Sequence, residues 1–189
     1  MIKVIGLTGT IGSGKYVVTD YLKQKFNYFY VKISDVLRNE MEKKRGKLDR
    51  KTLQDSGDEM RRKYGNHILA KVSIDYLPRN KELIVIDGIR NPGEIDYLKK
   101  TFGNDFVLIA TDSQPEQRFE RSKQRGRSDD PKTWEEFLEI DARDQGTGQP
   151  EYGQQTRKCM SKADFTIMND GSLEQFQANI AETVQKIFG

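Results

Sequence analysis

The residues with the clearest chemical potential are three glycines and a lysine near the start of the chain. They lie in Gly9-Thr10-Ile11-Gly12-Ser13-Gly14-Lys15, between an apolar run and a segment with helical periodicity. Glycines let backbone N–H groups wrap a phosphate, because side chains would obstruct that approach. The lysine ammonium then meets the β- and γ-phosphates, and the helix N-terminus adds its dipole. The pattern predicts a nucleotide phosphate site made by Gly9, Thr10, Gly12, Ser13, Gly14, Lys15, Tyr16 and Val17.

The residue after the lysine departs from this phosphate-loop (P-loop) pattern. A Ser or Thr hydroxyl usually ligates Mg²⁺ there, whereas this chain has Tyr16. A phenol cannot occupy the same inner-sphere position. Two hypotheses follow: the ion is held by phosphates, water and a distant carboxylate, or the chain binds nucleotide with lost or weak turnover.

A second chemical signal follows a continuous apolar run. Asp87 comes directly after Leu83-Ile84-Val85-Ile86, and ligands of open α/β sheets bind at the carboxyl ends of strands. We expect Asp87 to orient Mg²⁺ through water, or else to cap the helix that begins at Pro92. Arg90 follows three residues later and, with Arg38, could grip an acceptor phosphate, since the guanidinium fork matches phosphate oxygens. Asp35 could cap its helix or accept a proton from an acceptor hydroxyl.

A third signal is a polar, basic stretch in the second half of the chain. It contains Arg118, Arg121, Arg125, Arg127 and Arg143. Phosphoryl transfer is catalysed by positioning and electrostatic stabilisation, and cations on a closing segment would supply both. We expect two or three of these arginines to reach phosphate, Arg125 and Arg143 foremost, and the others to lie on a solvated face. The predicted catalytic set is Lys15, Asp87, Arg125, Arg127 and Arg143, with Arg121 on the nucleotide side.

Short β-rich runs alternate with helical segments along the chain. The predicted strands are 3–7, 28–33, 83–86, 106–110 and 163–168, and the predicted helices include 50–63, 66–77, 92–102 and 172–188. Alternation of this kind implies right-handed crossovers and a parallel sheet between helical layers. The sequence therefore predicts one α/β domain over 1–189: a three-layer α/β/α P-loop NTPase fold with a five-stranded parallel sheet and a helical lid.

The composition excludes several classes of protein. Hydrophobic residues make up 35% and charged residues 32% of the chain, and its net charge is +3. No run approaches the roughly 18 apolar residues of a membrane span. The start does not resemble a signal peptide, and the single Cys159 fits a reducing compartment. Acidic residues follow the basic stretch closely, and aromatic residues are not interleaved with it, which disfavours nucleic acid. We expect a cytoplasmic protein, a monomer or homodimer, without membrane or nucleic-acid partners.

Several segments resemble one group of kinases. Ile33–Arg38 and Leu83–Arg90 resemble nucleoside monophosphate kinases, while Gly6–Lys15 and the stretch 163–173 look like dephospho-coenzyme A kinase. Arg127-Ser128-Asp129-Asp130 is similar to the arginine and paired aspartates of adenylate-kinase lids. The resemblance covers the whole chain in order and spacing. It implies an acceptor-binding helical insertion near 35–80 and a lid near 115–148. It also implies an adenine contact at Asn169 and Gly171, which otherwise form a turn and helix cap.

These observations predict an ATP-dependent phosphotransferase that uses Mg²⁺ and acts on a nucleoside monophosphate or a similar small phosphorylated acceptor. ATP is expected as the donor because it is abundant, not because any residue selects adenine convincingly. A dephospho-coenzyme A kinase, which phosphorylates a hydroxyl, is the alternative enzyme. A nucleotide-binding regulatory protein is the alternative outside the enzyme class.

Overall fold

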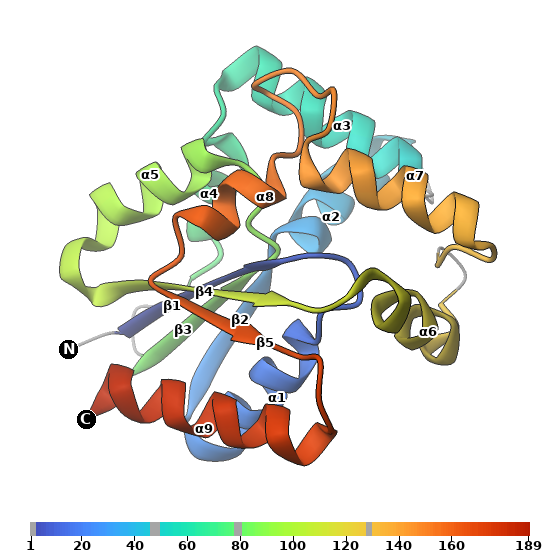
Figure 1. Cartoon of the computed structure of the whole chain (residues 1–189). Helices are drawn as coiled ribbons and strands as arrows, with labels where there is room; N and C mark the ends of the chain where they lie inside the picture. Colours follow the sequence, from blue (N-terminus) through green and yellow to red (C-terminus); the bar gives the residue numbers. More distant parts are fainter. Residues whose placement is uncertain (1–2, 46–49, 78–80, 128–129) are drawn as a thin grey trace.

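The protein is a parallel sheet between two layers of helices (Figure 1). The computed structural model describes residues 3–45, 50–77, 81–127 and 130–189. The strands are β1 (Lys3–Gly9), β2 (Tyr28–Lys32), β3 (Leu83–Asp87), β4 (Phe106–Asp112) and β5 (Phe165–Met168). They pair in the order β2-β3-β1-β4-β5, and each pairing is parallel. The predicted α/β/α fold with a five-stranded parallel sheet is confirmed.

Helices cover both faces of this sheet. They are α1 (Lys15–Lys25), α2 (Ile33–Arg45), α3 (Arg50–Tyr64), α4 (Ile68–Ile74), α5 (Pro92–Phe102), α6 (Pro115–Arg125), α7 (Trp134–Gln145), α8 (Thr156–Ser161) and α9 (Leu173–Phe188), with a short 3₁₀ turn at Gly103–Asp105. Helices α1 and α9 lie below the sheet in Figure 1, and α4, α5 and α8 lie above it. In the described part of the chain, no helix is long and apolar enough to cross a membrane.

The apolar runs form strands because both of their faces are buried. Along β3, Leu83 and Val85 pack with α1 and α9, while Ile84 and Ile86 pack with α4, α5 and α8. Successive side chains of a strand point to opposite faces, so a continuous apolar run suits a central strand of a covered sheet. Such burial is the main favourable term in folding. It fixes the carboxyl ends of β1, β3 and β4 at one edge.

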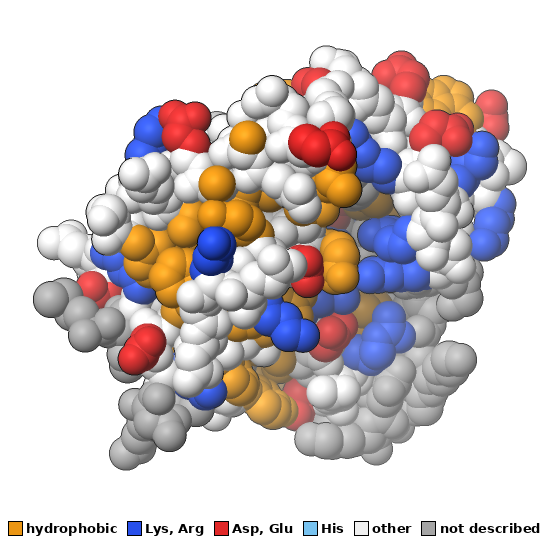
Figure 2. All heavy atoms as spheres, turned by 90° about the horizontal axis from the view of Figure 1, so that it is seen from below, with side chains coloured by type: hydrophobic (Ala, Val, Ile, Leu, Met, Phe, Trp, Pro, Cys, Tyr) orange, Lys and Arg blue, Asp and Glu red, His pale blue; other side chains and the backbone are white. Residues whose placement is uncertain are grey.

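Basic and apolar side chains occupy different parts of the lower face. Figure 2 shows hydrophobic side chains gathered towards the left and centre, and Lys and Arg side chains gathered on the right. The right side is the one towards which the strands point their carboxyl ends in Figure 1. The fold thus places a concentration of positive charge at the sheet edge where ligands of such folds bind.

Arg118, which belongs to the basic stretch, is structural. Its side chain is 1% exposed and makes two bonds to Asp141 of α7, at 2.6 and 2.9 Å. It also donates to the backbone oxygens of Ile11 and Ser113, and its guanidinium lies over the ring of Phe137. Helices α6 and α7 are therefore joined to each other and to the loop after β1.

The predicted boundaries of the insertion and the lid remain predictions. Helices α2, α3 and α4 occupy most of 35–80, and α6 and α7 occupy most of 115–148. Residues 46–49 and 78–80 of the insertion, and Ser128 and Asp129 of the lid, lie outside the described residues.

Replacing Asp141 by Ala should lower the free energy of unfolding by about 3–5 kcal/mol, because it leaves Arg118 charged and buried without its partner. Urea denaturation would measure the change. The matched control is Asp96→Ala, which removes a carboxylate from an exposed ion pair with Lys162 and should have a much smaller effect. Equal effects of the two variants would contradict a structural role for the Arg118–Asp141 pair.

Candidate functional site

The loop between β1 and α1 needs glycine at two positions for its shape. Gly12 and Gly14 have φ angles of 77° and 101°, which residues with a side chain rarely adopt. A Cβ atom on Gly12 would lie 2.4 Å from the backbone oxygen of Arg118, and one on Gly14 would lie 2.4 Å from Nδ2 of Asn169. Backbone strain and lack of space therefore both select glycine.

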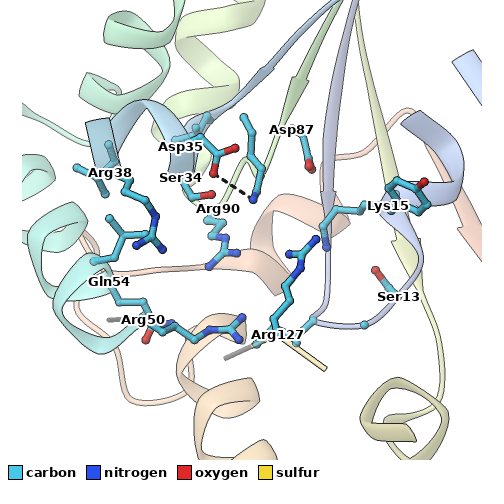
Figure 3. A pocket seen from close by; sticks show the side chains of 18 of the residues that line it. Ser13, Lys15, Ser34, Asp35, Arg38, Arg50, Gln54, Asp87, Arg90 and Arg127 are labelled. Carbon is cyan, nitrogen blue, oxygen red and sulfur yellow. Dashed lines mark hydrogen bonds and ion pairs between the residues drawn. The ribbon is translucent and has the colours of Figure 1, made fainter. Parts of the chain in front are cut away.

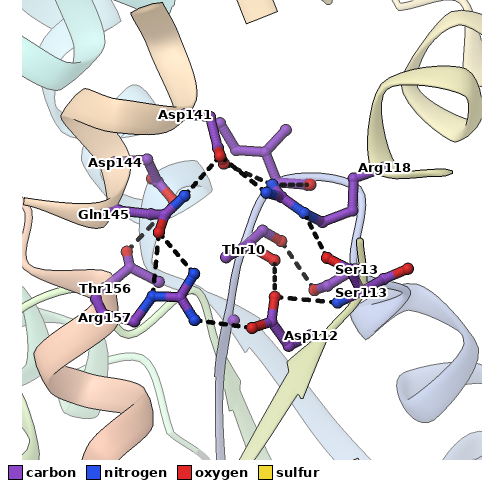
Figure 4. Close-up of polar contacts among 12 residues, drawn as sticks. Thr10, Ser13, Asp112, Ser113, Arg118, Asp141, Asp144, Gln145, Thr156 and Arg157 are labelled. Carbon is purple, nitrogen blue, oxygen red and sulfur yellow. Dashed lines mark hydrogen bonds and ion pairs between the residues drawn. The ribbon is translucent and has the colours of Figure 1, made fainter. Parts of the chain in front are cut away.

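Polar side chains brace this loop from the neighbouring strands (Figure 4). The hydroxyl of Thr10 donates to Asp112 at 2.8 Å. The hydroxyl of Ser13 bonds the backbone oxygen of Thr10 at 2.8 Å and the hydroxyl of Thr111 at 2.7 Å. Asn169, beyond β5, donates to the backbone oxygen of Ser13 at 3.1 Å. Asn169 thus reaches the loop, whereas Gly171 is exposed nearby. The predicted adenine contact stays a prediction.

Lys15 begins α1 and turns back over the loop. Its Nζ donates to the backbone oxygens of Gly9 at 2.6 Å and Thr10 at 2.9 Å. Burial lowers the pKa of the Lys15 ammonium from 10.5 to about 8, although the carboxylates of Asp87 and Asp144 oppose the shift. The ammonium is therefore held where the phosphates of a nucleotide would lie on this loop.

A cavity of about 340 Å³ extends from this loop to helices α2 and α3. Nine cationic side chains line it: Lys15, Lys32, Arg38, Arg50, Arg61, Arg90, Arg121, Arg125 and Arg127. Its acidic side chains are Asp35, Asp87 and Asp130. Figure 3 shows Ser13, Lys15 and Asp87 on one side, and Arg38, Arg50 and Gln54 opposite them. We call this space the cationic cavity. Its charge suits a ligand with several phosphates.

Asp87 lies at the end of β3 and is 8% exposed. Its Oδ2 accepts a bond from the hydroxyl of Tyr30 at 2.7 Å, and burial together with this carboxylate raises the pKa of that hydroxyl. Its Oδ1 is buried and has no partner among the described residues. The alternative role as a helix cap is wrong, because Asn91 caps α5 and its side chain accepts from the N–H of Gly93.

The fit of a metal ion here rests on that unpartnered oxygen. A buried carboxylate oxygen without a partner is unfavourable unless something binds it. Within the described ranges there is no group of three or more His, Cys, Asp or Glu side chains that could hold an ion by themselves. Asp87 thus suits Mg²⁺ held mainly by phosphates and water, which is how this ion commonly binds nucleotide enzymes.

The three predicted acceptor residues line the cavity but differ in their partners and exposure. Arg90 pairs with Asp144 of α7, whose carboxylate lies 2.7 Å from its Nη1. Asp35 is more than half exposed and pairs with Lys32 at 3.2 Å. Arg38 lines the same cavity from α2. The structure therefore places Asp35, Arg38 and Arg90 around the same cavity, and their binding of an acceptor stays a prediction.

The predicted lid arginines separate into two groups. Arg121 and Arg125 line the cavity, and Figure 3 shows Arg127 extending into it. Burial lowers the pKa of Arg121, which donates to the backbone oxygen of Asn169 at 2.7 Å. Arg125 is held by the carboxylate of Asp130, with Nε 2.9 Å from Oδ2.

Arg143 does not line the cationic cavity. It points to α3, where it pairs with Asp55 at 2.6 Å and Asp58 at 3.0 Å. The expectation that Arg143 would be among the foremost phosphate contacts is therefore unsupported by its position, because those two carboxylates hold it against α3. It joins α7 to the acceptor-side helices instead.

The sequence reasoning assigned no specific role to several residues of the site. Buried Gln54, Arg61 and Gln154 line the cavity, and Asp144 holds Arg90 from outside it. A buried polar side chain of this kind has no local sequence signal, since such residues usually face water.

Comparisons with known proteins place the chain in a family. Residues 8–137 match the family model described as an AAA domain. The UPF0200 protein of Methanocaldococcus jannaschii is 34% identical over 187 residues, which cover 97% of this chain and 90% of that protein. The UPF0200 protein of Pyrococcus horikoshii is 35% identical over 188 residues, which cover 97% of each chain. The chain belongs to the UPF0200 family and carries an AAA domain.

Solved structures show which fold this member of the UPF0200 family shares. TT1252 from Thermus thermophilus superposes with a TM-score of 0.61 at 20% identity, over 100% of this chain and 99% of that one. Shikimate kinase from Bacteroides thetaiotaomicron gives 0.56 at 13% identity, over 99% of each chain. The chain therefore has the fold of P-loop kinases. The finer resemblance to nucleoside monophosphate kinases or dephospho-coenzyme A kinase remains a prediction.

The affinity of the protein for ATP should fall above about pH 8. The ammonium of Lys15 has its pKa lowered to about 8, so it loses its charge in the free protein above that pH. Binding phosphates favours the charged form, so binding at higher pH must take up a proton and weakens by up to about tenfold per pH unit. Titration calorimetry between about pH 6.5 and 9.5 would measure the dissociation constant on both sides of that pKa.

The matched control for this pH dependence is Lys15→Met, which keeps most of the side-chain volume and has no titrating group. Its weaker affinity should be flat between about pH 7.5 and 9.5, because no group at this position then changes its charge. An equal decline in both proteins would assign the effect to another group.

Proposed function

We propose that the protein is an ATP-dependent phosphotransferase that acts on a nucleoside monophosphate or a similar small phosphorylated acceptor. One observation supports this most strongly: a single cavity is lined by the glycine-rich loop and Lys15 at one end and by Arg38 at the other, with Arg90 between them. Cations stand at both ends of this cavity, so each end could hold a phosphate-bearing ligand.

Each end of the cavity would do a different part of the reaction. The loop N–H groups and Lys15 would hold the donor phosphates, and Mg²⁺ would neutralise their oxygens with help from Asp87. Arg90 and Arg38 would hold the acceptor phosphate. An acceptor oxygen forms a bond to the γ-phosphorus while the bond to the bridging oxygen breaks, and that oxygen leaves on ADP. An ionised phosphate oxygen carries no proton, so this transfer needs no general base.

Arg121, Arg125 and Arg127 would stabilise the charge on the transferring group. They line the cavity from α6 and the segment after it. Preorganised cations in a site that excludes water act more strongly than they do in bulk solvent. Arg125 is already held in place by Asp130, which reduces the reorganisation needed during transfer.

The hydroxyl-acceptor alternative, a dephospho-coenzyme A kinase, draws support from Asp35. This carboxylate lines the cavity on the acceptor side and is largely exposed, so it is available to accept a proton. The two enzymes differ in the acceptor that they consume. A panel containing both kinds of acceptor therefore separates them.

The test is ATP consumption with Mg²⁺ across nucleoside monophosphates, with dephospho-coenzyme A included. Consumption should depend on one monophosphate. Lys15→Ala and Arg90→Ala should each lower kcat/KM by about 10²-fold or more, because each removes a cation from the transferred or accepting phosphate. The surface variant Asp96→Asn should match the wild type. If only dephospho-coenzyme A responded, the acceptor assignment would move to a hydroxyl.

Tyr16 separates an enzyme from a nucleotide-binding regulatory protein. Its side chain is 73% exposed at the edge of the cavity, so it is not required for packing. If the ion is held without a loop hydroxyl, Tyr16→Ser should change kcat by less than about tenfold, or 1.4 kcal/mol of transition-state stabilisation. Steady-state kinetics would measure this. A wild type that binds ATP without turnover, together with measurable turnover by Tyr16→Ser, would establish the regulatory alternative.

A further inference from the structure

The guanidinium of Arg90 is held at one corner and open along one edge. Its Nη1 lies 2.7 Å from Oδ1 of Asp144. Its Nε and Nη2 make no contact with a described residue that would occupy their N–H groups, and the side chain lines the cationic cavity. Figure 3 shows this side chain directed into the cavity, between the wall that carries Lys15 and the wall that carries Arg38. An open Nε–Nη2 edge is the arrangement that binds a phosphate through two parallel bonds.

Asp144 is built into the protein rather than exposed to solvent. It is 1% exposed in the last turn of α7, and its Oδ2 lies 3.3 Å from the hydroxyl of Thr156, which donates to it. A buried carboxylate is unfavourable unless it is paired and hydrogen-bonded, and here Arg90 and Thr156 meet both conditions. Two contacts of this kind leave Asp144 little freedom, and Arg90 is restrained with it.

Asp144 shares its helix face with Asp141, one turn earlier (Figure 4). Residues three apart on a helix lie on the same face. Asp141 binds Arg118, which donates to the backbone oxygen of Ile11 in the glycine-rich loop. Helix α7 therefore contacts the donor loop through one carboxylate–arginine pair and the acceptor-side arginine through another. A single rigid element sets the spacing between the two phosphate sites.

We propose that Asp144 is a positioning residue, which orients Arg90 so that its Nε–Nη2 edge faces the phosphate of the acceptor. The inference rests on the proposed function, because it names the residue that prepares the acceptor site. Orientation before binding raises affinity, since a long side chain no longer loses its freedom when the ligand arrives. Because Asp144 already binds Nη1, the N–H groups of Nε and Nη2 are the ones left to bind a phosphate.

The experiment compares Asp144→Asn with the wild type and with Asp96→Asn, which alters an exposed ion pair far from the cavity. Calorimetry measures binding of nucleoside monophosphates, dephospho-coenzyme A and inorganic phosphate, in the presence of a non-hydrolysable ATP analogue. At about pH 6.5, where Lys15 keeps its charge in both proteins, we expect Asp144→Asn to weaken binding of the phosphorylated acceptor by about 10- to 100-fold, and to leave binding of the ATP analogue alone within about threefold. Asp96→Asn should bind both as the wild type does.

A double variant tests whether Asp144 acts through Arg90. Arg90→Ala with Asp144→Asn should bind the acceptor no more weakly than Arg90→Ala alone, because the second change then has nothing left to orient. Additive losses would overturn the inference. So would tighter acceptor binding by Asp144→Asn, which would make Asp144 a competitor of the phosphate.

A third variant, Arg90→Lys, tests the same geometry if Asp144→Asn does not fold. Arg90→Lys retains a cation that can pair with Asp144 but lacks the second N–H edge, so it should also lose acceptor affinity. Acceptor binding by Arg90→Lys at the wild-type level would contradict the open-edge geometry.

Failure of the inference is distinguishable from failure of the proposed function. Acceptor binding that depends on Asp144 without turnover would remove the phosphotransferase and keep the inference. Turnover by the wild type, together with acceptor binding that does not change in Asp144→Asn, would keep the phosphotransferase and overturn the inference. A wild type that bound none of the phosphorylated compounds would overturn both.

Discussion

Charge compensation is the constraint on which this structure depends. A cavity lined by nine cations would be destabilised by their mutual repulsion if each side chain stood alone. Carboxylates hold two of these arginines: Asp144 holds Arg90 from outside the cavity, and Asp130, which lines the cavity, holds Arg125. Glu94, which is fully buried, does the same for Arg61. Arg61, Arg90 and Arg125 are therefore held in place by the fold before any ligand binds.

Sequence reasoning succeeded where a signal is local. The glycines of the loop and the apolar run before Asp87 are determined by backbone geometry and by burial on both faces of a strand, so each can be recognised from neighbouring residues. The sequence does not predict the role of a residue when that role depends on a partner far away in the chain. Arg118 and Arg121 look alike in the sequence, yet one is sealed against Asp141 and the other lines the cavity. Arg143 and Asp144 are adjacent, but consecutive helix positions face different directions. Arg143 therefore meets α3 while Asp144 meets Arg90.

Membership of the UPF0200 family and the P-loop kinase fold limit the chemistry without deciding it. One fold supports many acceptors, so function has to be argued from the site. Here the donor half follows the general pattern of phosphate loops, with the exception of Tyr16. On the side of the cavity proposed for the acceptor, Arg38, Arg61 and Arg90 lie beside the buried amides of Gln54 and Gln154. Those side chains, more than the loop, define what the second ligand must look like.

The aromatic contact between α6 and α7 has a spectroscopic consequence. Trp134 is the chain's single tryptophan. It stacks on Phe137 at 5.4 Å between ring centroids and meets the edge of Phe119 at 5.4 Å. It stands at the first position of α7, immediately after the segment that joins the two helices and carries Arg127. Any movement of α6 relative to α7 on ligand binding changes the surroundings of one indole. Its intrinsic fluorescence is thus a built-in optical reporter that requires no label and no substitution.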